Sequence, residues 1–117
     1  MDELDELRLR IAKAKGWKFP DVDIQCDVDY LIHHYQDEIP DWSRSIADMW
    51  ELVEEMKATA YSVGIYMLEG GWNCYVCYRY SLPDDPEEYH QLILETHGTA
   101  PEAICRCWLS WKEKGNA

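Results

Sequence analysis

The sequence predicts one α+β domain in which helices pack against a small, mainly antiparallel sheet. Two observations lead to this prediction. Residues 60–80 have the pattern of a β-hairpin, and three other segments have the spacing of amphipathic helices. A chain of 117 residues is also long enough to bury one hydrophobic core without disulfides or metal ions. We therefore expect a single domain over residues 1–117, built around the hairpin and three helices.

The hairpin is predicted from alternation on both sides of a glycine-rich turn. Apolar residues, most of them aromatic or β-branched, recur at every second position from 61 to 67 and again from 72 to 80. Glu69, Gly70 and Gly71 between them form a tight-turn sequence. Because large apolar residues occur on both faces, we expect helices to cover one face of the sheet and at least part of the other.

The first two helices are predicted over residues 2–15 and 44–58. The first has acids in its opening turns, bases in its second half and Gly16 after its end, as helix-dipole and capping preferences favour. For the second, Ser43 is the expected N-cap. The apolar residues expected to face the core from this helix are Ile46, Met49, Trp50, Val53 and Met56.

The last helix, over residues 100–113, has the clearest start signal. Thr99 and Glu102 have the spacing of a capping box, and Pro101 lies in the first turn. The apolar residues of this helix that we expect in the core are Ile104, Cys107, Trp108 and Trp111.

Two acidic stretches separate these elements. Residues 18–42 form an irregular segment in which short strands and a helix through 30–35 are both compatible with the pattern. Its aspartates lack the spacing of an EF-hand loop. Residues 81–90 contain two prolines and four acids and are expected to form a loop, followed by a strand at 91–96.

The net charge of −12 is the strongest compositional feature. It disfavours direct binding to nucleic acid or to an anionic membrane, because both are polyanions. The N-terminal residues are acidic and helical, unlike a signal peptide, and no apolar run approaches the length of a membrane span. We expect a cytoplasmic protein.

Five cysteines, an odd number, are expected to be free thiols that need no metal ion. Cys74 and Cys77 have the spacing of half a zinc site, but on a strand these positions point to opposite faces. Cys105 and Cys107 are two residues apart on a helix and also diverge. We expect no metal site and no cofactor.

Several motifs, in their order along the chain, resemble those of the phage ABA-sandwich domain family. The matching stretches are Gly16-Trp17, Ser43 to Met56, Trp72 to Tyr78 and Thr99 to Leu109, and the most specific is Thr-Ala-Pro-Glu-Ala-Ile-Cys at 99–105. The resemblance implies a small three-layer α/β/α sandwich encoded by a phage or prophage. It brings no assigned activity and no catalytic residues.

Catalysis is the function class that the sequence supports least. The four histidines stand outside any recognisable motif, and no phosphate-binding loop, nucleophile elbow or zinc-protease motif occurs. We therefore expect that the protein is not an enzyme. An alternative is an aromatic pocket for a nucleotide or other small ligand, although few basic residues are available for phosphate.

The favoured function is binding to a basic host protein, most simply one that holds nucleic acid, in the manner of a host-defence inhibitor. Spaced carboxylates on a folded scaffold can replace phosphates in a basic groove. Two runs of the chain contain eleven acids and no Lys or Arg. The predicted contact residues are Asp21, Asp23, Asp27, Asp29, Asp37, Glu38, Asp41, Asp84, Asp85, Glu87 and Glu88.

Overall fold

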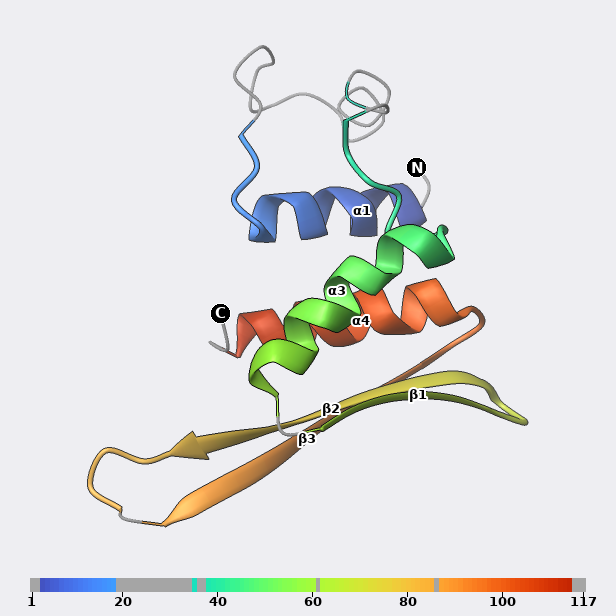
Figure 1. Ribbon diagram of the computed structural model, residues 1–117. Helices are drawn as coiled ribbons and strands as arrows, with labels where there is room; N and C mark the ends of the chain where they lie inside the picture. The colour runs from blue at the N-terminus through green and yellow to red at the C-terminus, as the bar shows by residue number, and fades with distance from the viewer. Residues whose placement is uncertain (1–2, 19–34, 36–37, 61, 86, 115–117) are drawn as a thin grey trace.

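Three helices and three strands make up the part of the chain that the structure, a computed structural model, describes: residues 3–18, 35, 38–60, 62–85 and 87–114. The elements in chain order are α1 (Glu3–Ala14), α3 (Ile46–Thr59), β1 (Ser62–Leu68), β2 (Gly71–Ser81), β3 (Glu88–His97) and α4 (Ala100–Glu113). Figure 1 shows their arrangement.

The sheet is antiparallel throughout, with β2 between β1 and β3. The predicted turn at Glu69, Gly70 and Gly71 is present, but Leu68 pairs with Gly71, so the turn itself is the two residues Glu69 and Gly70. Gly71 has φ +128°, and a Cβ atom there would lie 2.7 Å from the carbonyl oxygen of His97. Only glycine therefore fits where the turn meets the end of β3.

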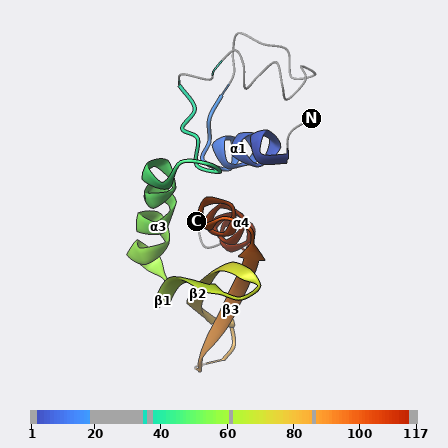
Figure 2. The same cartoon turned by 90° about the vertical axis from the view of Figure 1, so that its right-hand side faces the viewer.

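The helices of the described chain all lie on one face of this sheet (Figures 1 and 2). α4 crosses β2 and β3, α3 lies over β1, and α1 packs on α4. The predicted α+β class, with helices on a mainly antiparallel sheet, is confirmed. The layers are, in order, the sheet, then α3 with α4, then α1. This order differs from the α/β/α sandwich that the resemblance implies, in which helices lie on both faces of the sheet.

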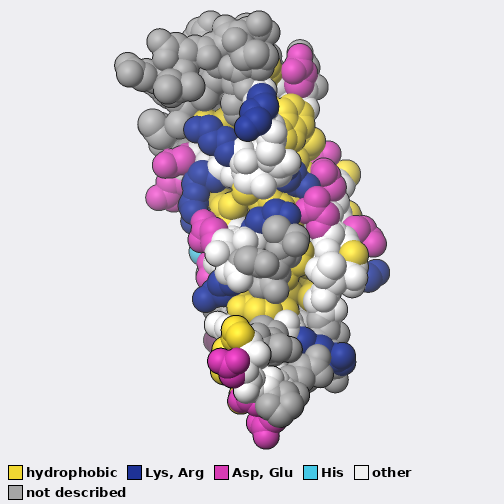
Figure 3. Space-filling model, turned by 90° about the vertical axis from the view of Figure 1, so that its left-hand side faces the viewer, with side chains coloured by type: hydrophobic (Ala, Val, Ile, Leu, Met, Phe, Trp, Pro, Cys, Tyr) yellow, Lys and Arg dark blue, Asp and Glu magenta, His cyan; other side chains and the backbone are white. Residues whose placement is uncertain are grey.

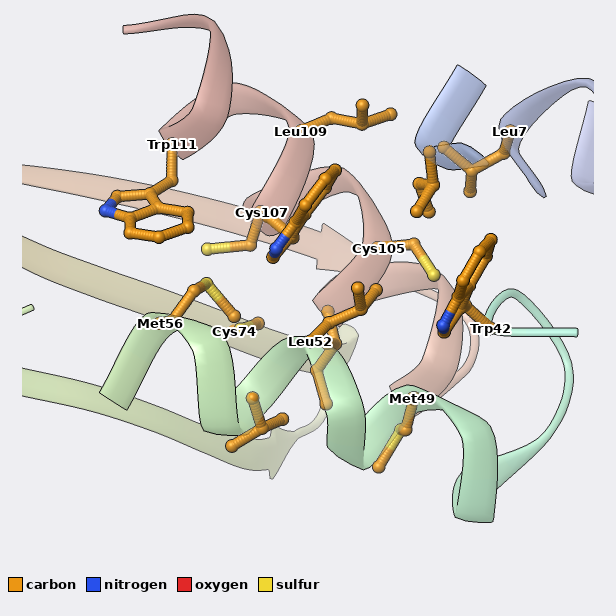
Figure 4. Close-up of a cluster of buried hydrophobic side chains, with 14 of the residues drawn as sticks. Leu7, Trp42, Met49, Leu52, Met56, Cys74, Cys105, Cys107, Leu109 and Trp111 are labelled. Carbon is orange, nitrogen blue, oxygen red and sulfur yellow. The ribbon is translucent and has the colours of Figure 1, made fainter. Parts of the chain in front are cut away.

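The apolar surface of α4 explains why the helices form two layers above the sheet. Nine of its residues are buried, so it is apolar around most of its circumference and needs cover on two sides. The sheet covers one side and α1 the other. The predicted core residues Ile104, Cys107, Trp108 and Trp111 are all buried, and Figure 4 shows this cluster together with side chains of α3.

The inward face of α3 differs from the prediction. Met49, Val53 and Met56 are buried as expected, and Leu52 is buried with them. The predicted burial of Ile46 and Trp50 is wrong, because these side chains are 61% and 47% exposed. The buried set follows the steps of three and four that define one helical stripe, and Trp50 lies about 100° from Met49 around the helix.

The start of α3 also differs. Its N-cap is Ser45, whose hydroxyl oxygen accepts a hydrogen bond from the Asp48 N–H at 3.2 Å. Ser43, the predicted cap, is buried, and its hydroxyl donates to the carbonyl oxygen of Leu4 in α1 at 3.1 Å. The serine thus ties the chain before α3 to α1.

Strand β3 is longer than the predicted strand at 91–96. It begins at Glu88, which pairs with Ser81 at the end of β2, and the connecting loop shrinks to residues 82–87. The acids and prolines of 81–90 suggested a loop throughout. Backbone pairing with β2 overrides that composition, because the main-chain hydrogen bonds do not depend on side-chain type.

A polar network that the sequence did not reveal holds the end of α1 against α3 and α4. The ammonium of Lys15, on a side chain only 9% exposed, lies 2.6 Å from Glu55 Oε1 and 3.1 Å from Glu51 Oε1. The indole N–H groups of Trp42 and Trp108 donate to Glu51 Oε2 and Glu55 Oε2 at 2.8 and 2.7 Å. Lys15 also lies 5.6 and 5.3 Å from the centroids of these two rings. Each carboxylate is thus bound by one cation and one indole.

This network predicts a pH dependence of stability. Burial raises the pKa of Glu51, but the hydrogen bonds from Trp42 and Lys15 outweigh it, so the pKa falls below its ordinary value of 4.5. A lowered folded-state pKa stabilises the fold above the unfolded-state pKa, and that stability disappears as the pH falls through the folded-state pKa.

We therefore expect Glu51→Gln to lose less stability than the wild type between about pH 5 and pH 3. Urea unfolding at several pH values measures this difference. Glu54→Gln on the exposed side of α3 is the matched control and should follow the wild type. Parallel acid curves for wild type and Glu51→Gln would contradict the assignment.

Candidate protein-binding surface

The two faces of the sheet differ sharply in exposure. On the inward face, Cys74, Val76, Tyr78 and Ile93 are buried beneath the helices. On the opposite face Tyr66, Leu92 and Leu94 are 39%, 59% and 49% exposed. No helix of the described chain lies over that side (Figure 2). We call Tyr66, Tyr75, Cys77, Leu92 and Leu94 the outer face.

The strand register makes these side chains neighbours. Gly64, Tyr75 and Leu94 stand opposite one another across the three strands, and Cys77 stands opposite Leu92 in the next row. Side chains in such rows lie about 4.5–5.5 Å apart at Cβ. The outer face is therefore continuous across the sheet.

Tyr75 is fixed in place at the centre of the outer face. A Cβ atom at Gly64 would lie only 2.3 Å from its ring, so the glycine leaves the space that the ring occupies. The ring of Tyr66 packs beside it, with centroids 6.3 Å apart and a 54° tilt. The Ser62 hydroxyl lies 3.5 Å from the Tyr75 hydroxyl. Such an ordered aromatic pair offers contact area at a low entropic cost on binding.

Charged residues are nearly absent from this side of the sheet. The positions that share its register and whose side chains the structure describes are Ser62, Gly64, Tyr66, Leu68, Asn73, Tyr75, Cys77, Arg79, Leu92, Leu94 and Thr96. Among these described positions Arg79 is the only charged residue, and it lies toward the β2–β3 loop. In a chain with 29% charged residues and a net charge of −12, this side is strongly depleted in charge.

Acids stand at both ends of the outer face. Glu69 is exposed in the β1–β2 turn, and Asp84 and Glu87 are exposed in the β2–β3 loop. Asp85 in the same loop accepts hydrogen bonds from the Tyr89 hydroxyl and from the Glu87 N–H, the latter at 2.9 Å. These two bonds lower the pKa of Asp85, which keeps its carboxylate ionised.

The predicted acidic contact residues do not gather in one place within the described chain. Asp21, Asp23, Asp27, Asp29 and Asp37 lie outside the described residues. Glu38 and Asp41 lie before α3, at the end of the molecule opposite the loop with Asp84, Asp85 and Glu87 (Figure 1). Glu88 belongs to β3.

Asp41 is engaged in contacts within the fold. The Arg44 guanidinium lies 3.5 Å from its carboxylate, and the Ser43 hydroxyl oxygen lies 3.2 Å from it. Arg44 also contacts Asp5 of α1 at 2.9 Å. This carboxylate is therefore part of the joint between α1 and the start of α3.

The described cysteines are free thiols, and their positions divide them into two groups. Cys74, Cys105 and Cys107 are buried, whereas Cys77 lies on the outer face. The predicted divergence of Cys74 and Cys77 is confirmed. A hydrogen bond with Cys74 and burial raise the pKa of Cys107, and burial raises the pKa of Cys105, so both stay protonated. No group of three or more potential metal ligands occurs among the described residues.

The aromatic surplus fills the core more than it lines a pocket. Trp42, Trp108 and Trp111 are buried. An open hollow of about 470 Å³ between α1 and α4 has Arg10, Lys13 and Lys112 around Leu109. Figure 3 shows this end of the molecule, with Lys and Arg beside hydrophobic side chains. Two of its cations are engaged: Arg10 contacts Glu113 at 3.2 Å, and Lys112 lies 5.6 Å from the ring centroid of Trp108.

The described helices include none that is long and apolar enough to cross a membrane. Comparison of the chain with protein-family models, curated proteins and solved structures found no match.

Proposed function

We propose that this protein acts by binding another protein, and that the outer face is the centre of the contact. The observation that supports the proposal is a charge-depleted apolar and aromatic surface on a molecule of net charge −12. The centres of protein interfaces are depleted in charge and enriched in tyrosine. Clustered apolar exposure of this kind marks interaction sites in folded proteins.

The chemistry around the outer face favours a basic partner. Its apolar centre lies between Glu69 at one end and Asp84 and Glu87 at the other. A complementary protein has an apolar patch with lysines or arginines at its rim. A host protein that holds nucleic acid, as expected from the sequence, has such a rim, and the small acidic protein would occupy it in place of the nucleic acid. Rim charges of this kind act on the association rate and are screened at high salt.

Lysine substitutions at the centre of the outer face test the proposal. Changing Leu92 and Leu94 together to Lys should weaken partner binding by about thirtyfold or more, the loss expected for an interface hot spot. The partner is first captured from host lysate and purified, and the affinity is then measured by calorimetry. Ile46→Lys is the matched control, because Ile46 is also apolar and exposed but lies on α3.

Both variants should melt within a few degrees of the wild type, since the changed side chains are exposed. Unchanged affinity in the Leu92→Lys/Leu94→Lys variant would contradict the outer face as the contact. A second variant, Asp84→Asn with Glu87→Gln, tests the acidic rim separately from the apolar centre. It should slow association and reduce the salt dependence while leaving dissociation nearly unchanged.

A further inference from the structure

We infer that a second copy of this chain pairs with the free edge of β1, joining two sheets into one six-stranded sheet. In the described chain β1 is an outer strand, with β2 on one side and no strand on the other. Its unpaired edge therefore presents main-chain N–H and C=O groups that another strand can bond. This inference goes beyond the proposed function and does not depend on it.

β1 lacks the charged residues, prolines and bulges that natural edge strands use to prevent pairing. Its sequence, Ser-Val-Gly-Ile-Tyr-Met-Leu, has no charge and no proline. Its pairing with β2 runs from Ser62 to Leu68 without a bulge. The other edge strand, β3, contains Glu88 and Glu95. An uncharged, regular, apolar edge strand tends to pair with a strand of another molecule. In this sheet β1 has such an edge and β3 does not.

The exposed apolar surface extends from β1 into the helix layer. A hollow of about 180 Å³ lies between α3 and β1, with Trp50 and Val53 on the helix side and Val63 and Ile65 on the strand side. Trp50 is 47% exposed, and Met67 of β1 is 66% exposed. An added strand alone would cover β1 but would bring nothing against Trp50. A second copy brings its own α3 beside the first, because α3 and β1 lie at the same side of the molecule (Figure 2).

The charges beside the edge suit a two-fold contact between identical chains. Lys57 lines the hollow, and Glu54 lies 3.8 Å from it on the same helix, both largely exposed. A two-fold axis places like surfaces opposite each other, so each Lys57 can meet Glu54 of the second copy. The absence of charge on β1 lets two acidic molecules approach at this edge. The outer face stays open in such a dimer and becomes twice as wide.

Sedimentation equilibrium of the full chain, without any partner, tests the inference. The wild type should be a dimer at about 100 µM and dissociate on dilution. Met67→Lys should raise the dissociation constant by about a hundredfold or more, because the two-fold axis introduces the charge twice. Leu92→Lys, an exposed leucine of β3 on the outer face, is the matched control and should stay dimeric. A monomeric wild type, or a Met67→Lys protein that dimerises equally well, would overturn the inference.

Amide hydrogen exchange identifies the contact. In the wild type at high concentration, the amides of 62–68 should exchange more slowly than in Met67→Lys, while thermal melts show that the variant is folded. A dimer that leaves these amides unprotected uses another surface and overturns the inference. A monomeric wild type whose partner binding is lost in Met67→Lys would show that the edge takes a foreign strand instead. Failure of dimerisation alone leaves the outer-face proposal intact.

Discussion

Replacing Trp108 with Ala is expected to lower the free energy of unfolding by about 3–5 kcal/mol. The side chain is fully buried on α4, and Lys15, directly after α1, lies 5.3 Å from its ring. Its removal leaves a cavity and also deprives Glu55 of the indole N–H, which donates to it at 2.7 Å. Urea unfolding followed by circular dichroism measures the loss.

Trp50→Ala is the matched control for this prediction. It also removes a tryptophan side chain, this time from α3, but that side chain is 47% exposed. The expected loss in the monomeric protein is about 1 kcal/mol or less, as for ordinary surface changes. Equal losses for the two variants would show that the core is not organised around α4 as the structure indicates.

Replacing Lys15 with Met is expected to cost about 1–3 kcal/mol, between the values typical of exposed and buried ion pairs. The methionine keeps most of the aliphatic side chain but removes the ammonium that lies 5.6 and 5.3 Å from the ring centroids of Trp42 and Trp108. Glu51 and Glu55 then lose their shared cation, although both keep an indole hydrogen bond. Their partial exposure, at 50% and 39%, moderates the loss.

The comparison for this variant is Lys13→Met, two residues earlier on α1 and exposed. It should change the unfolding free energy by about 0.5 kcal/mol at most. If Lys15→Met changes the unfolding free energy as little as Lys13→Met does, the network contributes no stability. High salt should reduce the difference between the two variants only slightly, because the Lys15 ammonium is shielded from solvent.

The elements of this fold that local chemistry determines could be predicted from sequence. Gly70 and Gly71 specify the hairpin turn, and the hydroxyl oxygen of Thr99 does accept a hydrogen bond from the Glu102 N–H at 3.3 Å. Trp108 is buried as its spacing predicts. Each of these depends on residues within a few positions of one another. The resemblance to the phage ABA-sandwich family stays a prediction.

The features that the sequence missed depend on contacts between distant segments. Periodicity could not decide which of the adjacent Met49 and Trp50 faces the core, because that depends on where α4 lies. Nor could it place Lys15 against Glu51 and Glu55, which come from another helix. The outer face was missed for the same reason. Large apolar residues on both faces led us to expect helices over part of the second face as well, whereas the described helices all lie on one face.

The acidic runs show a further limit of sequence. Charge per segment is visible in the chain, but the distance between segments is not. Asp41 and Asp84 belong to two runs of similar composition, yet the segment before α3 and the β2–β3 loop, which contain them, lie at opposite ends of the described molecule. What the sequence treated as one contact surface is therefore divided, and the apolar surface beside the second run supports the stronger proposal.

The most direct test of the outer face as a binding surface uses Cys77 as a probe. It is the one described thiol that is not buried, and it stands opposite Leu92 and two residues after Tyr75 on β2. The rate at which a maleimide alkylates Cys77 is measured by mass spectrometry in the free protein and in the complex with the purified partner. We predict that partner binding slows this reaction at least about tenfold, since the centre of an interface excludes water and reagent. An unchanged alkylation rate in the fully bound complex would contradict the account.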